Sequence, residues 1–540
     1  MSEQYFDFQR IFRYDIDTYN AVHQLNTENK EELNKIYQMI KTNLIDSRRY
    51  RPRKIIENIL NIIPYNNRYA EQYLELAKHI YDEYRVEGVM YCNIFNYLFY
   101  KVYGINLNKS ADFEENNSDN LNVHTENTIY RTIMYNDLKI FISFTEREGF
   151  DKDERLISKL YPHSKKGYSL LELCCYHGAV DCFKLLRTKF DSKITQKCLR
   201  FSFLGGNPEI MSECLKYQKP NQKCMKFAII SHNIDFVTFL MNEYNLEISL
   251  YDCGKYNNLE SFFVYYAQTN DINECFYLSA LYEMLPLCEY FIVHGANIHT
   301  KNCCGDSAFH QAVNHNNKEM AELLLSYGAN INAKNIFGNT PLHMAALDDR
   351  KEMVEFLISH GANIDLQGRA GETALQYAAA NNRKEVLKVL ISHGANIYEK
   401  DYYDNTALQL ASYNDSKEMI EYLISNGANI GDKNKHGRTA LHNAANENRK
   451  ETTEILISHG ANVNDKDIYG NTPLHFAACK NCKETAELLL SHGVNIRIKD
   501  NDGNTAFRVA VENNCKETAE LLFAYGTGLR LILPPEPRTA

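Results

Sequence analysis

The 540-residue sequence predicts an all-α solenoid in which helix pairs are joined by short β-hairpin fingers and preceded by a small helical module. The first observation is a glycine that recurs every 33 residues from Gly295 to Gly526. The second is a serine or threonine with the same spacing, from Ser307 to Thr505. Each interval also holds two apolar segments with helical periodicity, so each unit must stack on its neighbours to bury its apolar face.

Residues at the ends of the predicted helices fit such a unit. A hydroxyl such as that of Thr340 can accept a hydrogen bond from the free amides of the first turn, and Pro341 follows where a missing N–H costs nothing. The recurring glycine ends the second helix with positive φ. Glycine is usual at the finger tip as well; Asp404 replaces it once, and there we expect a slightly strained or differently aimed finger.

The turn between the two helices carries Asn or Asp in every unit. These are the non-glycine residues that adopt the left-handed conformation most readily, so we expect positive φ at each of them. The positions are Asn316, Asp349, Asn382, Asp415, Asn448, Asn481 and Asn514. A Lys-Glu pair then begins the second helix, where a carboxylate suits the positive end of the helix dipole.

The repeated phrases resemble the ankyrin repeat. They are TPLHMAA from Thr340, TALQYAA from Thr373, TALHNAA from Thr439 and TPLHFAA from Thr472, each followed by GANI or a close variant. The resemblance implies a solenoid that binds a protein partner through its concave face. It also implies that His343, His442 and His475 form hydrogen bonds within and between neighbouring repeats, which is a structural role rather than a catalytic one.

Five segments divide the chain. They are a helical N-terminal module at residues 1–105, a polar linker or loop at 106–128, degenerate ankyrin-like helical repeats at 129–306, seven regular ankyrin repeats at 307–526 and a C-terminal tail at 527–540. The degenerate repeats are spaced more closely, and their turns are expected at Gly178, Asn233 and Asn257. This layout resembles ankyrin-repeat families of certain protists, in which a degenerate region precedes the regular repeats. The N-terminal module either caps the solenoid or docks a partner.

The composition disfavours nucleic-acid and membrane partners. The net charge is −10, and acidic residues outnumber basic ones across residues 305–526, whereas phosphate binding needs clustered positive charge. No segment reaches the roughly 18 continuous apolar residues of a membrane span. The 15 cysteines show no disulfide pattern and no signal-like segment follows Met1, so we expect a cytoplasmic protein with reduced thiols. We also expect a monomer.

Two short motifs have chemical alternatives to a structural role. The basic cluster SRRYRPRK at residues 47–54 is expected to be the solvated start of a helix; a nuclear-import patch, and hence a nuclear location, or phosphate binding are the alternatives. Cys479 and Cys482 form a C-x-x-C motif one turn after His475, which could hold zinc or carry redox chemistry. Plain substitution explains them as well, because other units have arginine at the position of Cys482. We predict no catalytic residue, metal or cofactor.

A row of side chains is predicted to bind the partner. It combines residues just before the finger tips with residues on the exposed face of the first helices. Aromatic side chains are favoured at protein interfaces because they are large and rigid; packing on neighbouring fingers is the structural alternative. This predicted binding row contains Ile336, Phe337, Met344, Tyr377, Tyr402, Tyr403, Leu410, Tyr413, His436, Ile468, Tyr469 and Phe476.

The sequence therefore predicts a non-enzymatic scaffold or adaptor that binds a protein of unknown identity through its concave surface. One alternative is a substrate adaptor whose N-terminal helices recruit effector machinery such as a ubiquitin ligase. The other is a zinc-binding or catalytic protein that uses Cys479 and Cys482.

Overall fold

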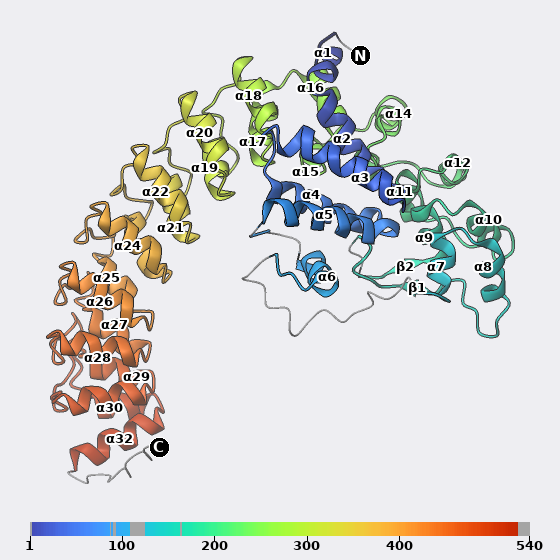
Figure 1. Cartoon of the computed structure of the whole chain (residues 1–540). Coiled ribbons are helices and arrows are strands. Elements are labelled where there is room, and N and C mark those ends of the chain that lie inside the picture. The colour runs from blue at the N-terminus through green and yellow to red at the C-terminus, as the bar shows by residue number, and fades with distance from the viewer. Residues whose placement is uncertain (1–2, 87, 90–92, 108–124, 163–164, 528–540) are drawn as a thin grey trace. The chain divides into compact units, whose positions relative to one another are not determined.

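The computed structural model describes residues 3–86, 88–89, 93–107, 125–162 and 165–527, mostly as helices (Figure 1). The chain divides into two compact units, Met1–Ala296 and Asn297–Ala540. The predicted all-α class with paired helices is confirmed. Most of the predicted linker at 106–128 and almost all of the predicted tail at 527–540 lie outside the described residues. No helix in the described ranges has the length and apolarity that crossing a membrane requires.

The first unit begins with helices that form no repeat. They are α1 (Glu3–Ile11), α2 (Arg13–His23), α3 (Lys30–Met39), a π-helical segment (Ile40–Ile45), α4 (Pro52–Ile62), two 3₁₀ turns (Ile63–Tyr65 and Asn67–Tyr69), α5 (Ala70–Tyr84) and α6 (Asn93–Tyr103). Pro64 separates α4 from α5, since proline cannot donate the backbone hydrogen bond that a continuing helix needs.

Helix pairs follow in the same unit. They are α7 (Ile129–Met134) with α8 (Leu138–Thr145), α9 (Leu170–His177) with α10 (Val180–Thr188), α11 (Gln196–Gly205) with α12 (Pro208–Tyr217), α13 (Gln222–Ile230) with α14 (Ile234–Tyr244), α15 (Leu250–Lys255) with α16 (Leu259–Thr269), and α17 (Ile272–Leu281) with α18 (Leu285–Val293). Each first helix contacts the next first helix from α7 to α17. Before α9, strands β1 (Arg155–Leu156) and β2 (Tyr168–Ser169) pair antiparallel, with Arg155 opposite Ser169.

The N-terminal helices pack on these degenerate repeats. Helices α1 and α2 both contact α16. Phe8 of α1 is completely buried and stacks on Phe263 of α16, with the ring centroids 4.4 Å apart. The imidazole of His23, at the end of α2, stacks on that of His232 with 3.7 Å between centroids. The module therefore covers the edge of the repeats at which the turns between paired helices lie.

Turn residues beneath the module are buried and left-handed. His232, Asn257 and Glu283 have φ of 53°, 53° and 60° and are no more than 5% exposed. Gly178 and Asn257 take positive φ, but at the third expected turn residue, Asn233, the prediction is wrong by one position. His232 takes the left-handed conformation, and the Asn233 side chain instead caps α14 by accepting from its first backbone N–H groups.

The basic cluster SRRYRPRK precedes and begins α4 as expected, with Ser47 and Arg48 exposed, but its other cations are half-buried and several of them form ion pairs within the first unit. Arg49 forms an ion pair with Asp15, whose side chain is completely buried. Arg51 and Lys54 each lie 3.6 Å from a carboxylate oxygen of the buried Glu283. These cations compensate charges that burial would otherwise penalise.

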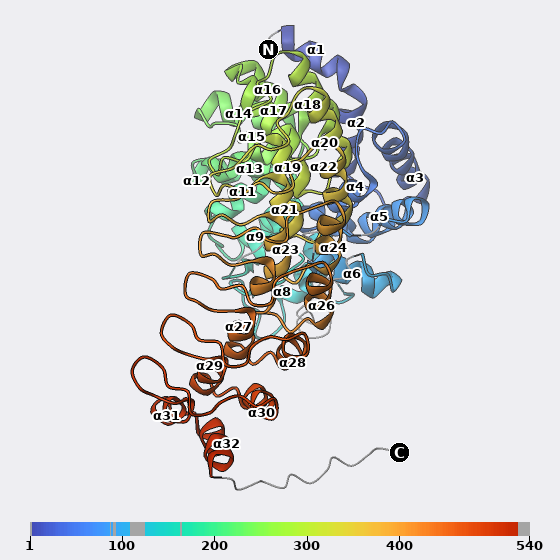
Figure 2. The same ribbon diagram turned by 90° about the vertical axis from the view of Figure 1, so that its left-hand side faces the viewer.

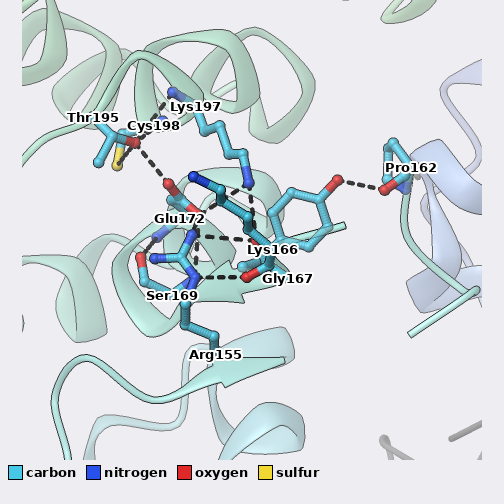
Figure 3. A network of polar contacts seen from close by, with 10 residues as sticks. Arg155, Pro162, Lys166, Gly167, Ser169, Glu172, Thr195, Lys197 and Cys198 are labelled. Carbon is cyan, nitrogen blue, oxygen red and sulfur yellow. Dashed lines mark hydrogen bonds and ion pairs between the residues drawn. The ribbon is translucent and has the colours of Figure 1, made fainter. Parts of the chain in front are cut away.

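Glu172 shows how a degenerate repeat replaces the histidine of the T-P-L-H phrase (Figure 3). Its Oε2 accepts from the backbone N–H of Ser169 at 3.1 Å, and its own N–H donates to Ser169 Oγ at 3.3 Å. Its Oε1 accepts from Thr195 Oγ1 of the next repeat at 2.8 Å. Arg155 and Lys197 lie 3.4 and 3.9 Å from Oε2. The buried carboxylate thus caps α9 and joins two repeats, a role indicated in the sequence by the capping-box pattern S-x-x-E.

The second unit consists of regular helix pairs, whose connections project to one side in Figure 2. The pairs are α19 (Ala308–Asn314) and α20 (Lys318–Ser326), α21 (Pro341–Leu347) and α22 (Lys351–Ser359), α23 (Ala374–Ala380) and α24 (Lys384–Ser392), α25 (Ala407–Ala411) and α26 (Lys417–Ser425), α27 (Ala440–Asn446) and α28 (Lys450–Ser458), α29 (Pro473–Cys479) and α30 (Lys483–Ser491), and α31 (Ala506–Glu512) and α32 (Lys516–Gly526). First helices contact one another in order from α19 to α31, and second helices do so from α22 to α32.

Each histidine of the T-P-L-H phrase joins two repeats, as the resemblance implies. Nδ1 of His343 accepts from the Thr340 N–H at 3.2 Å, and Nε2 lies 3.0 Å from the carbonyl oxygen of Glu372 in the next repeat. This pattern requires a neutral ring with its proton on Nε2, and burial lowers the pKa of His343. Gln376 makes equivalent bonds: Oε1 accepts from its N-cap amide at 2.8 Å, and Nε2 donates to the Asn405 carbonyl at 2.8 Å.

Positive φ is confirmed at six of the seven expected turn residues. Their φ values lie between 51° and 58° at Asn316, Asp349, Asn382, Asn448, Asn481 and Asn514. The side chain has a second role there: Oδ1 of Asn448 accepts from the Thr485 hydroxyl of the next repeat at 3.0 Å. The turn residue therefore joins neighbouring repeats as well as reversing the chain.

The prediction of positive φ is wrong at Asp415. Helix α25 ends early, at Ala411. The Asn414 side chain donates to the carbonyl oxygens of Ala379 and Ala380 in the preceding repeat, at 3.2 and 3.1 Å. Such side-chain bonds to the backbone compete with helix continuation. Asp415 keeps the contact between repeats by accepting from the Thr452 N–H at 3.2 Å.

Candidate protein-binding surface

Most fingers of the second unit are closed by a side chain at the base; the finger that carries Arg369 has Gly368 at this position and is closed by backbone hydrogen bonds alone. Oδ1 of Asp401 accepts from the backbone N–H groups of Tyr403 and Asn405, both at 2.8 Å. Asn335 closes the finger that carries Phe337 in the same way. Asn and Asp favour such turns because their side chains reach amides two residues ahead. The tip backbone is therefore set from the base, and the tip side chains are not needed to hold it.

Backbone hydrogen bonds also join each finger tip to the preceding one. The donor and acceptor residues are Ile336 and Cys304 (3.1 Å), Arg369 and Phe337 (3.3 Å), Tyr402 and Ala370 (2.8 Å), Lys435 and Tyr403 (2.9 Å), Ile468 and His436 (3.0 Å), and Asn501 and Tyr469 (2.9 Å). The tips thus form a continuous row. A backbone that is ordered before a partner arrives reduces the entropy lost on binding.

The tip members of the predicted binding row are exposed. The exposed fractions are 56% for Ile336, 52% for Phe337, 57% for Tyr402, 58% for Tyr403, 53% for Ile468 and 55% for Tyr469, and His436 is exposed as well. Asp404, at the tip beside Tyr403, has φ of 60°, so it takes the left-handed conformation that glycine takes in the other fingers. These side chains are therefore exposed on a backbone that hydrogen bonds hold in place.

The first-helix members of the row are more buried and partly engaged inside the repeats. The Tyr377 hydroxyl donates to Asn339 Oδ1 at 2.8 Å. The Phe476 ring lies under the guanidinium of Arg438, 4.6 Å from its centroid. Met344 and Leu410 are half-buried, whereas Tyr413 is 36% exposed. The structural alternative, packing on neighbouring fingers, therefore describes Tyr377 and Phe476.

Sequence inspection missed an alternation along the tips. The fingers with Ile336-Phe337, Tyr402-Tyr403 and Ile468-Tyr469 alternate with fingers that carry Arg369-Ala370 and Lys435-His436. Arg369 and Lys435 are both exposed. The alternation appears in the sequence as a 66-residue spacing. It becomes apparent only when the basic residues at the tips are considered together with the aromatic ones.

The acidic residues of this unit lie mainly away from the finger tips. None of the first helices from α19 to α29 contains Asp, Glu, Lys or Arg, so the surface they form has no formal charge of its own. The second helices carry the Lys-Glu pairs and further glutamates. On the fingers, the buried Asp401 and Asp467 are turned toward amides of their own turns. The net negative charge of this part of the chain is therefore not found at the finger tips.

Cys479 and Cys482 take part in stacking contacts. The Cys482 thiol faces the Asn446 carbonyl at 3.8 Å, where Arg449 of another repeat donates to the Tyr413 carbonyl at 2.8 Å. Burial raises the pKa of Cys482 to about 11, which disfavours the thiolate that metal binding and redox chemistry use. Within the described part of the chain, no cluster of three or more His, Cys, Asp or Glu side chains could hold a metal ion.

Comparison with protein families defines the class. The family described as ankyrin repeats matches residues 276–368, 362–434, 426–500 and 464–531, and a domain of unknown function, DUF3447, matches residues 190–265. No curated protein matches the chain. The chain is an ankyrin-repeat protein whose repeats follow a region of that uncharacterised family. Its ankyrin repeats support a role in protein–protein interaction.

Proposed function

We propose that this protein is a non-enzymatic scaffold or adaptor that binds a protein partner through the concave surface of residues 297–527, chiefly at the finger tips. The observation that carries the proposal is the row of six apolar or aromatic tip side chains, each more than half exposed on a backbone already fixed by hydrogen bonds. Interfaces concentrate binding energy in such large, rigid side chains. Tyr413 and the half-buried Met344 and Leu410 extend this surface onto the first helices.

The histidine side chains that could suggest catalysis have structural roles. Both ring nitrogens of His343 and His442 are engaged in hydrogen bonds within and between repeats. We further propose a monomer in the cytoplasm: the described cysteines are all free, as expected in a reducing compartment. The paired state of Arg49, Arg51 and Lys54 weighs against a nuclear-import patch.

Proximity labelling with the full chain tests the proposal. We expect Tyr403→Ala/Tyr469→Ala to remove the specifically labelled partner, because it deletes two exposed tip rings. The matched control is Tyr217→Ala/Tyr251→Ala, which removes rings that are 57% and 54% exposed in the first unit. Labelling that is unchanged by the tip substitutions, or equally lost in the control, contradicts the proposal.

A second candidate is an adaptor whose N-terminal helices recruit effector machinery. The observation that favours it is a set of exposed apolar side chains on α1 and α2: Phe6 is 58%, Ile11 44% and Tyr14 69% exposed. Phe6→Ala/Tyr14→Ala in the full chain would then remove one class of labelled proteins and keep the partner that depends on Tyr403 and Tyr469. If both classes persist, the N-terminal helices only cover the repeats.

A further inference from the structure

The alternation of apolar or aromatic tips with cationic tips indicates which kind of partner would fit this surface. Arg369 lies between the tips of Phe337 and Tyr402, and Lys435 lies between those of Tyr403 and Ile468, each joined to its neighbours by the backbone bonds described above. The order along the row is therefore apolar, cationic, aromatic, cationic, apolar. A ligand that lies along the tips meets positive charge on both sides of the Tyr402-Tyr403 pair.

The two cations are available to a ligand. In the described ranges, no hydrogen bond or ion pair engages the Arg369 guanidinium. The Lys435 ammonium donates to the backbone carbonyl of Tyr402 and so lies beside the aromatic tip, with further N–H donors left over. Guanidinium groups bind carboxylates with two parallel hydrogen bonds.

The tips carry more cations than carboxylates, although the partly exposed Glu372 directly follows the tip of the Arg369 finger. From Ile336 to Gly470, Asp404 is the one acidic residue at a tip. The carboxylate of Asp401 closes its own finger, and that of Asp467 is buried at 3.8 Å from Arg438. The first helices contribute no formal charge. The tips therefore carry a local excess of positive charge on an acidic protein.

We propose that the partner presents an extended segment with acidic side chains on both sides of an aromatic or apolar one. The acidic groups pair with Arg369 and Lys435, and the central side chain packs on Tyr402 and Tyr403. This inference rests on the proposed function and adds the chemistry of the partner. The charges at the tips, rather than the acidic net composition of the chain, decide this chemistry.

Fluorescence anisotropy with the full chain tests the inference on polymers of known composition. The probe is a labelled random copolymer of glutamate and tyrosine; polyglutamate, a lysine–tyrosine copolymer and polyuridylate are the comparisons. We expect the glutamate–tyrosine copolymer to bind most tightly and its affinity to fall as salt is raised. Arg369→Glu/Lys435→Glu should weaken binding by about tenfold or more, since two attractions become repulsions.

A matched variant separates local charge from net charge. Lys417→Glu/Lys450→Glu makes the same change in net charge at exposed positions on α26 and α28, and it should keep the affinity within about twofold because surface charges there do not face the ligand. Equal weakening in this control, or tighter binding of the lysine–tyrosine copolymer or of polyuridylate, would overturn the inference.

The inference and the proposed function can fail separately. If Tyr403→Ala/Tyr469→Ala abolishes labelling of the natural partner while Arg369→Glu/Lys435→Glu leaves it intact, the acidic segment is wrong and the scaffold role stands. If neither pair of substitutions changes labelling, the proposed surface itself is wrong.

Discussion

The two units use the same left-handed turn between paired helices, but they differ in what lies over it. In the first unit, His232 and Glu283 take this conformation while buried under the N-terminal helices. In the second, Asp349, Asn382 and Asn448 take it while exposed. The backbone requirement is shared, but the side chains differ: the exposed turns use Asn or Asp, whereas two of the three covered turns use His232 and Glu283, whose side chains contact the N-terminal helices.

The two units also differ in the length of the connections between one helix pair and the next. Residues 218–221 suffice to connect α12 to α13, whereas residues 327–340 connect α20 to α21. In the first unit, several turns between paired helices are covered and the connection between α12 and α13 is short, whereas the second unit has long fingers and exposed turns. This contrast explains why we place the partner-binding surface in the second unit.

Loss of the stacked Phe8 ring should have the largest effect. Phe8→Ala removes a fully buried ring that stacks on Phe263, and we expect it to lower the free energy of unfolding of the first unit by about 3–4 kcal/mol. Phe337→Ala, at a tip that is 52% exposed, should change stability by less than about 0.5 kcal/mol. Urea unfolding followed by hydrogen exchange in residues 259–269 checks both. Equal losses of stability in Phe8→Ala and Phe337→Ala would contradict the difference between the covered and the exposed regions.

Glu283 and Asp349 test the turn position directly. Glu283→Asn keeps a residue that tolerates positive φ but leaves Arg51 and Lys54 without their carboxylate, so we expect a loss of about 2 kcal/mol. Asp349→Asn changes an exposed turn and should be neutral within about 0.5 kcal/mol. Thermal unfolding compares the pair. A neutral Glu283→Asn would show that the module does not depend on this ion pair.

Acid should weaken the regular repeats through their capping histidines. Burial lowers the pKa of His442 to about 4, so the folded state favours the neutral ring. That contribution is complete above about pH 6.5, the unfolded value, and is lost as the pH falls toward 4, by about 2–3 kcal/mol. His442→Gln should flatten this pH dependence while keeping the cap, as Gln376 and Gln409 do. Unfolding curves at pH 7 and pH 4.5 measure it. An unchanged slope would mean that the ring is not held neutral.

The smallest effect is expected at the tips. Asp404→Gly relieves a left-handed aspartate with φ of 60° and should stabilise the second unit by about 0.5 kcal/mol or less. The reverse change, Gly470→Asp, should destabilise it more, because an added Cβ would lie 2.9 Å from the backbone nitrogen of Asn501. Differential scanning calorimetry orders the three proteins, and the opposite order would contradict the equivalence of the tips.

Local features were predictable because the same residue types recur at the same positions in successive repeats. The caps at Thr340 and Thr373, the positive φ at six turns and the exposed tips follow from residue types at fixed spacing. Packing of Phe8 on Phe263 was not predictable in the same way, since a contact between residues so far apart in sequence has no periodic signal. The ion pairs of the basic cluster were not predictable for the same reason, because the fold brings its partners Asp15 and Glu283 to it.

Hydroxyl-radical footprinting of the full chain, alone and with the partner captured by labelling, tests the central claim most directly. In the free chain we expect strong modification at the tips carrying Phe337, Tyr403 and Tyr469, and protection of Phe8 and Phe263. Addition of the partner should protect the tips. Tips that are already protected in the free chain, or partner-dependent protection that appears at Phe6 and Tyr14 instead, would contradict the account.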